Sequence, residues 1–303
     1  MAIPFNREID FEYGKVDQVS PLIRRVIANN PGPFTFVGTG TFIVGQGEVA
    51  VLDPGPVDAA HFEALKAALK GETVKYVLVT HGHSDHSPLA RPLAEWAGCK
   101  VYSKDRGKQT AKGELGSEDD IGFHPDVLIK DGDRFTGPGW TLETIETPGH
   151  TCSHLCFDLK EENACLTGDH IMGWSTTIVA PPDGNMADYF RSLGKVEARG
   201  FDTLWPTHGS PIVGKAFVAE FIQAYRQHRQ AREDGIIAHL KAGEASIPNM
   251  VKDMYVGLED RLFPAACLSL LGHMVKLIDE GRVTCDVAKP VVQSAYRLVE
   301  VEA

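Results

Sequence analysis

Residues 80–86 read THGHSDH and place three histidines and one aspartate within seven positions. The apolar segment VKYVLV comes directly before them, and its β-branched residues predict a strand that ends where the polar residues begin. Clustered imidazoles alone fit a surface accident, a pH switch or a metal site. So many ligand-type side chains in one short segment favour a metal site, with His81 and His83 turned toward one ion and Asp85 and His86 toward a neighbouring one.

Three later apolar segments end in a similar way. TLETIETP, NACLT and FDTLWPT each predict a strand, and each is followed by one ligand-type residue beside a glycine, which lets the backbone approach closely. The pairs that follow these strands are Gly149 and His150, Gly168 and Asp169, and His208 and Gly209. Because strand ends in α/β folds gather in a common cleft, we expect ligands from all four strand ends to converge on one site.

The order HxHxDH, then His, Asp and His, resembles the metallo-β-lactamase superfamily over residues 15–215. The resemblance implies an α/β fold, an αββα sandwich of two mixed β-sheets flanked by helices. It also implies a ligand set in which one metal is held by His81, His83 and His150, a second by Asp85, His86 and His208, and both by a bridging Asp169. No ligand position is substituted. The intact pattern favours hydrolysis over electron transfer, because redox di-iron relatives replace part of the hexapeptide.

Two further residues are implied near this site. The segment VLDPGP resembles the early aspartate loop of the family, which would make Asp53 a residue that orients a ligand histidine, although a plain Asp-Pro-Gly turn fits equally well. His154, in GHTCSHLCF, aligns with a second histidine of the family. It is expected either near the site or in a buried, hydrogen-bonded structural role.

The ligand types suggest the chemistry. A nitrogen-rich set with carboxylates suits two Zn²⁺ ions, although iron or manganese would also fit. Two ions about 3.5 to 4 Å apart can share a water, lower its pKa toward about 7 and hold the resulting hydroxide as nucleophile. In this scheme Asp85 and Asp169 are the catalytic carboxylates that act with the metal-bound hydroxide. We expect zinc-dependent hydrolysis of an ester-like bond, namely an ester, thioester, lactone or phosphodiester.

Composition indicates where the protein is expected to act. The 303-residue chain has a net charge of −11, which disfavours non-specific attraction to nucleic acid or anionic membranes. The first residues lack a basic segment followed by an apolar run, and we expect no apolar segment that reaches the roughly 20 residues of a membrane span. Six scattered cysteines do not form a disulfide framework. We therefore expect a cytoplasmic protein with reduced thiols and no membrane association.

After residue 215 the pattern changes to three helical segments and a short extended end, typical of a small winged-helix domain. We expect a hydrolase domain over residues 1–222 and a winged-helix-like domain over residues 223–303. The tail and the segment DHIMGWSTTIVAPPDGNMADYFRSL resemble the β-lactamase-like protein 2 branch, whose better-known members are linked to endoribonuclease activity on single strands.

Several functions therefore stay open. A small-molecule hydrolase needs only the two metals and a shaped pocket, whereas an endoribonuclease on single-stranded RNA also needs cations along a groove. The clustered candidates for such cations are Lys104, Arg106, Lys108 and Lys112. Promiscuous β-lactamase activity is chemically within reach. The non-enzymatic alternative is a winged-helix nucleic-acid-binding module.

The charge of the tail bears on these alternatives. From Arg226 onward, 10 Lys and Arg residues stand against 11 Asp and Glu residues, so the tail has a net charge of −1 and no basic footprint. We expect it to pack on the hydrolase or to pair subunits in a homodimer rather than to bind duplex DNA.

Overall fold

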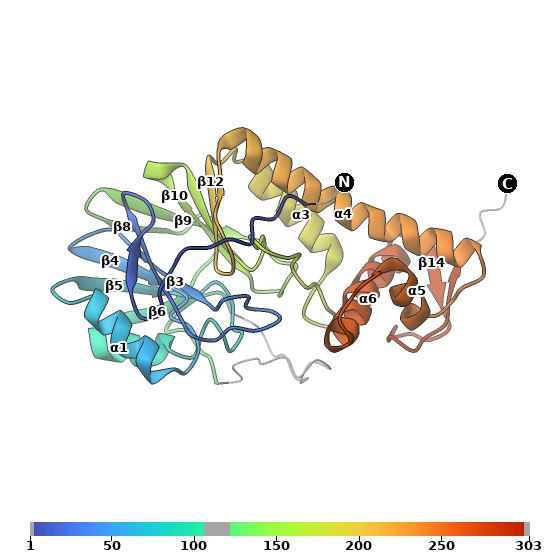
Figure 1. Ribbon diagram of the computed structural model, residues 1–303, viewed down its shortest axis with the longest axis horizontal. Helices are drawn as coiled ribbons and strands as arrows, with labels where there is room; N and C mark the ends of the chain where they lie inside the picture. Colours follow the sequence, from blue (N-terminus) through green and yellow to red (C-terminus); the bar gives the residue numbers. More distant parts are fainter. Residues whose placement is uncertain (1–2, 106–121, 300–303) are drawn as a thin grey trace.

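The computed structural model describes residues 3–105 and 122–299. Within these ranges, two large mixed sheets pack face to face, and helices cover the outer face of each (Figure 1). The predicted αββα sandwich is therefore confirmed. Most of the polar segment between residues 103 and 122, including Arg106, Lys108 and Lys112, lies outside the described residues.

The first sheet follows the chain order from β1 to β7. Its early strands pair antiparallel, and the pairs from β4 onward are parallel. Its strands are β1 (Val16–Gln18), β2 (Ile23–Ile27), β3 (Gly40–Val44), β4 (Glu48–Leu52), β5 (Thr73–Leu78), β6 (Lys100–Ser103) and β7 (Val127–Leu128). Helices α1 (Ala59–Ala68) and α2 (Ala90–Ala97) cover its outer face.

The second sheet has the order β13-β12-β11-β10-β9-β8, and its β11–β12 pair is parallel. Its strands are β8 (Arg134–Gly137), β9 (Trp140–Glu146), β10 (Leu155–Leu159), β11 (Ala164–Gly168), β12 (Thr203–Pro206) and β13 (Ile212–Val213). A 3₁₀ turn, η1 (Lys160–Glu162), joins β10 to β11. Helix α3 (Met186–Glu197) and the first half of α4 (Lys215–Lys241) cover its outer face.

The period-two pattern of the strands separates the apolar layers of the sandwich. In β3, Phe42 and Val44 pack in the core between the sheets, whereas Ile43 packs under α1 and α2. Successive side chains of a strand point to opposite faces, so a strand buried on both sides reads as a continuous apolar run. The run TFIV in this strand therefore contributes to two cores at once.

The C-terminal domain is built on α4, which is continuous across the expected boundary between residues 222 and 223. Its first half contributes Phe221 to the core of the second sheet, and its second half contributes Ile236 to a separate C-terminal core. The remaining elements are α5 (Ile247–Met254), η2 (Asp260–Leu262), α6 (Phe263–Asp279), and the hairpin strands β14 (Val283–Cys285) and β15 (Tyr296–Leu298). Figure 1 shows α4 running from the second sheet to this domain.

Helix α6 corrects the expectation that no apolar segment is long enough to cross a membrane. Residues Asp260–Asp279 meet that length and composition, and 61% of the most apolar window is buried inside the fold. Leu270 and Met274 of α6 are fully buried in the C-terminal core. The apolar composition of α6 is thus explained by packing on all sides within a small helical domain.

Replacing Leu270 by Ala should lower the free energy of unfolding by about 2–5 kcal/mol, because the substitution leaves a cavity in the C-terminal core. Val256 is 91% exposed, so Val256→Ala is the matched control and should change stability by no more than about 0.5 kcal/mol. Urea unfolding followed by circular dichroism in detergent-free buffer measures both. Equal stabilities of the two variants would contradict a core role for α6.

Candidate metal centre

Loops at the ends of two parallel strand pairs, one in each sheet, carry the predicted ligands. Residues 81–86 follow β5, which lies parallel to β4 in the first sheet. Asp169 and His208 follow β11 and β12, which are parallel neighbours in the second sheet. His150 lies in the loop between β9 and β10. Parallel neighbours end at the same edge of a sheet, so these loops meet at one place.

The first trio of ligand atoms consists of three imidazole nitrogens. His83 Nδ1 lies 2.8 Å from His81 Nε2 and 3.1 Å from His150 Nε2. Donor atoms that share a zinc ion at about 2.0–2.1 Å each lie about 3–4 Å apart. The three nitrogens therefore have the spacing of a shared cation site.

The second trio combines one carboxylate with two imidazoles. Asp85 Oδ2 lies 3.0 Å from His208 Nε2 and 3.4 Å from His86 Nε2, and these two nitrogens lie 3.3 Å apart. His86 and His208 are fully buried. This trio also has the spacing of donors around one ion.

Asp169 stands between the two trios. Its Oδ2 lies 3.7 Å from His150 Nε2 of the first trio, and its Oδ1 lies 3.5 Å from His86 Nε2 of the second. Oδ1 is buried and has no hydrogen-bond partner. A buried carboxylate oxygen without a partner is costly, and a cation held at this point would compensate it. The donor set therefore fits the divalent cations that the resemblance implies, and Asp169 lies within reach of both trios.

Hydrogen bonds to the far ring nitrogen orient three of the imidazoles. His150 Nδ1 contacts the carbonyl of Ile178 at 2.6 Å, and His208 Nδ1 contacts the carbonyl of Gly38 at 3.1 Å. His81 Nδ1 lies 3.0 Å from Thr80 Oγ1. Because a carbonyl can only accept, Nδ1 of His150 and His208 carries a proton, and Nε2 is the nitrogen that faces the site.

Asp53 is the centre of a buried hydrogen-bond network beside the second trio. Its Oδ2 accepts from Thr80 Oγ1 at 2.8 Å and Thr207 Oγ1 at 3.2 Å and contacts His86 Nδ1 at 2.9 Å, while its Oδ1 accepts from Thr80 N at 2.8 Å. Of the two interpretations that the sequence left open, this geometry fits the one in which Asp53 orients a ligand histidine. Its backbone also makes the turn, with φ of +46°.

His154 combines the two roles that were expected as alternatives. The ring is fully buried and its Nδ1 lies 2.9 Å from Thr147 Oγ1, as in a structural role. Its Nε2 accepts a hydrogen bond from the backbone N–H of Asp169 at 3.1 Å. His154 therefore lies next to the site and holds the backbone of Asp169.

Sequence reasoning missed Thr80 and Thr207, which donate to Asp53 from opposite sheets. A signal for them was present, because Thr-His-Gly occurs both at residues 80–82 and at residues 207–209. The carbonyl groups of Gly38 and Ile178 were also missed. Any residue offers a backbone carbonyl, so no residue type could have marked these two.

The electrostatics of the two trios differ. Burial, followed by the neighbouring imidazoles, lowers the pKa of His83 to about 4 and holds the pKa of His81 well below its ordinary value. These rings are neutral at pH 7 and offer lone pairs. Burial also acts to lower the pKa of His86, but the carboxylates of Asp85 and Asp169 outweigh it and raise that pKa well above its ordinary value. The second trio thus attracts positive charge, for which a proton and a metal ion compete.

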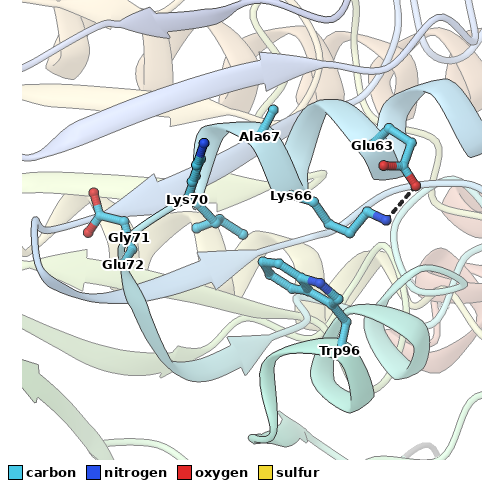
Figure 2. Close-up of a pocket in the computed structure, with 8 residues that line it drawn as sticks. Glu63, Lys66, Ala67, Lys70, Gly71, Glu72 and Trp96 are labelled. Carbon is cyan, nitrogen blue, oxygen red and sulfur yellow. Dashed lines mark ion pairs between the residues drawn. The ribbon is translucent and has the colours of Figure 1, made fainter.

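A surface cavity of the first sheet's helical layer lies apart from the candidate metal centre. A cavity of about 510 Å³ lies between α1 and α2 and is lined by Lys66, Lys70 and Trp96, among others. Figure 2 shows Lys66 paired with Glu63 above the Trp96 ring. None of the seven predicted ligands lines this cavity.

A model of the metallo-beta-lactamase superfamily matches residues 35–208, and a model of the beta-lactamase associated winged helix domain matches residues 246–288. The chain belongs to the metallo-β-lactamase superfamily. The predicted resemblance to the superfamily and to a branch with a C-terminal winged helix is thereby confirmed, and it assigns the chain to a group of proteins that are generally hydrolases.

Individual members of this superfamily show the same likeness. The beta-lactamase-like protein 2 homolog of Caenorhabditis elegans is 32% identical over 237 residues, which cover 76% of this chain and 74% of that protein. An atrochrysone carboxyl ACP thioesterase of Aspergillus fumigatus is 32% identical over 237 residues, which cover 75% of this chain and 67% of that protein. The crystal structure of a beta-lactamase domain protein from Burkholderia ambifaria has a TM-score of 0.77 at 23% identity, covers 94% of both chains, and shares the fold.

We predict that the purified protein binds about two transition-metal ions and that each trio accounts for about one of them. His150→Ala and His208→Ala should each remove about one ion, since they belong to different trios, and Asp85→Ala should resemble His208→Ala. Elemental analysis after dialysis measures the stoichiometry. His124 is exposed, so His124→Ala is the matched control and should keep both ions. Full occupancy in all three ligand variants would refute the assignment.

Asp53→Asn should weaken metal binding about 10–100-fold, the usual effect of losing a group that orients a ligand histidine. The amide keeps the size of the side chain but replaces one acceptor oxygen with an NH₂ group. That group donates hydrogen bonds and would face the N–H and O–H groups that now donate to Asp53. Asp58, whose side chain caps the start of α1, offers the control Asp58→Asn at a surface position of the same loop. Competition with a chromogenic chelator gives both affinities. Equal values for the two variants would assign Asp53 to the turn alone.

Proposed function

We propose that this protein is a dinuclear metal-dependent hydrolase that cleaves an ester-like bond. The observation that carries the proposal is the placement of Asp169, whose buried carboxylate reaches toward both trios and has an oxygen without a hydrogen-bond partner. An isolated structural metal would need only one closed set of ligands. Two adjoining sets that share one carboxylate are typical of sites that perform hydrolysis.

The residues of the chain contribute position and charge to this chemistry. Two divalent cations, when bound, would lower the pKa of a water molecule and polarise the carbonyl or phosphoryl group of the substrate. Asp85 and Asp169 hold negative charge at the site, and the side chain of Asp85 remains 20% exposed. The five ligand imidazoles, when neutral, leave the loaded centre with a net positive charge that favours an anionic substrate.

Zinc is the metal that we propose, because nitrogen-rich donors with two carboxylates suit it well. Iron and manganese remain the alternatives, since both accept imidazole and carboxylate ligands. The three metals call for the same experiments and differ only in the ion that is supplied to the protein.

Among the ester-like bonds we favour a thioester. The preference for a thioester is supported by the Aspergillus fumigatus relative, which is named an ACP thioesterase and aligns over three quarters of this chain. Esters, lactones and phosphodiesters need the same two-metal chemistry and form the other arms of the test. We further propose that the substrate is a small molecule or a carrier-bound acyl group and that the enzyme acts in the cytoplasm, where its six free cysteines would stay reduced.

Single-stranded RNA is less well supported as a substrate. Of the four basic residues proposed to line a groove, Lys104 is the one among the described residues, and its Nζ pairs with Glu146 Oε2 at 2.8 Å. A lysine neutralised in this way contributes little attraction for phosphate groups. The acidic tail points in the same direction, and it also weighs against a duplex-DNA-binding module.

The protein should hydrolyse at least one thioester of a panel that also contains esters, lactones, phosphodiesters, single-stranded RNA and β-lactams. Chelation should abolish that activity and restored zinc should return it, because the proposed nucleophile is a water activated by the metal ions. Release of free thiol, measured with a thiol-reactive dye, follows the reaction. Asp169→Asn provides the inactive control with nearly unchanged side-chain size.

Other results of this panel have definite meanings. Preferred cleavage of RNA would move the function to the nuclease alternative. Metal content below one ion per chain, together with retardation of duplex DNA in a mobility-shift assay, would replace the hydrolase proposal with the binding-module alternative.

A further inference from the structure

The segment between Asp169 and α3 is attached to the C-terminal helices through its backbone. The phenol of Tyr225, on α4, contacts the carbonyls of Met172 at 2.8 Å and Ser175 at 2.7 Å and accepts from Met172 N at 3.1 Å. One turn later on the same face of α4, Arg229 donates from Nη2 to the carbonyl of Thr177. These bonds hold a stretch of loop that has no regular secondary structure of its own.

The same stretch of loop touches two of the predicted metal ligands. Thr177 Oγ1 donates to the carbonyl of Asp169 at 2.7 Å. The next residue, Ile178, offers the carbonyl that receives Nδ1 of His150 at 2.6 Å. The position of residues 177 and 178 therefore sets both the backbone of the bridging aspartate and the rotation of a ligand ring.

Helix α6 contacts the loop at the following residue. A Cβ atom built on Gly272 of α6 would lie 2.5 Å from the carbonyl oxygen of Val179, so the absence of a side chain allows the helix and the loop to touch. Figure 1 shows α6 beside the C-terminal half of α4, both on the side of the sandwich where α3 lies. Residues 177–179 are thus held by α4 at one position and by α6 two positions later.

Arg229 is an unusual residue to find in such a place. Its side chain is 2% exposed, and its guanidinium lies 5.1 Å from the centre of the Tyr189 ring. A buried charge is retained without cost only if it is compensated, and here the bond to the Thr177 carbonyl and the face of Tyr189 supply part of that compensation. Tyr189 in turn donates to the carbonyl of His170 at 2.7 Å, so the cation is tied to the loop at two points.

We propose that the C-terminal domain positions the metal centre, with Arg229 as the positioning residue that fixes Thr177 and Ile178 and, through them, Asp169 and His150. Tyr225 and Arg229 lie on α4 before the region that matches the winged-helix model, whereas Gly272 of α6 lies within it and meets the same loop. The helix α4 and the appendage that it carries are on this view structural parts of the hydrolase site. This inference rests on the proposed metal centre, because it concerns how well the ligands are held.

The test compares two arginines of α4. Arg229→Met keeps most of the buried volume and removes the bond to Thr177. Arg226 lies one turn earlier, and its Nη2 pairs with Glu197 Oε2 at 3.3 Å, away from the loop. Arg226→Met is therefore the matched control. Zinc affinity is measured on the full-length protein by competition with a chromogenic chelator, and the visible absorption of the Co²⁺-loaded protein reports the geometry of the ligands.

In Arg229→Met we expect zinc affinity to fall by about tenfold or more, the range seen when groups that orient metal ligands are lost, together with a changed Co²⁺ spectrum. Arg226→Met should match the wild type in both measurements. Zinc affinity and the Co²⁺ spectrum both depend on where the ligands are placed. A variant that is only less stable would still place its ligands correctly in the molecules that remain folded, so both measurements on those molecules would match the wild type. Wild-type affinity and spectrum in Arg229→Met would overturn the proposal.

A second variant keeps the proposal testable if Arg229→Met does not fold. Thr177→Val has the same shape and removes only the hydroxyl that holds the Asp169 carbonyl. It should weaken zinc binding in the same direction, and wild-type affinity here would overturn the coupling through Thr177. If the wild type itself binds no metal in stoichiometric amount, the metal-centre proposal fails as well. If the wild type binds zinc normally and the variants bind it equally well, only the inference about the C-terminal domain fails.

Discussion

The buried carboxylate of Asp53 joins loops from both sheets, and the remainder of the site is arranged around it. Asp53 is 1% exposed, and a charge so far from water has to be compensated by donors or cations. The donors come from Thr80 and His86 after β5 and from Thr207 after β12. These strands belong to different sheets. Satisfying one carboxylate therefore also fixes how the sheets meet at this edge and how the His86 ring is turned.

A second compensation of charge concerns the ligands themselves. In the first trio burial holds the pKa values of His81 and His83 low, whereas the carboxylates of Asp85 and Asp169 raise the pKa values of His86 and His208. One side thus offers lone pairs, and the other side attracts positive charge. Divalent cations would accept the lone pairs of the first trio and compensate the negative charge at the second. Metal binding to such a site therefore couples to the stability of the surrounding loops.

The C-terminal region belongs to this architecture more closely than its composition suggests. A tail with a net charge of −1 and a winged-helix pattern invites the question of which partner it binds. In the structure, α4 takes part in the core of the second sheet and in the C-terminal core, and Tyr225 and Arg229 hold the backbone of the loop that follows Asp169. Helix α6 is apolar because it is packed between these elements.

The sequence alone predicted the sandwich, which the structure confirms, and named the seven candidate ligands that the structure brings together. Both depend on local information, namely residue type at strand ends such as His81 and Asp169 and the period-two burial of the strands. Tertiary structure alone placed Asp53 against the His86 ring, brought Thr207 to it from a distant strand, and selected the Ile178 carbonyl as the partner of the His150 ring. The reason is physical: hydrogen bonds to backbone groups and between residues far apart in the chain depend on where the sheets and loops meet, and no residue type encodes that position.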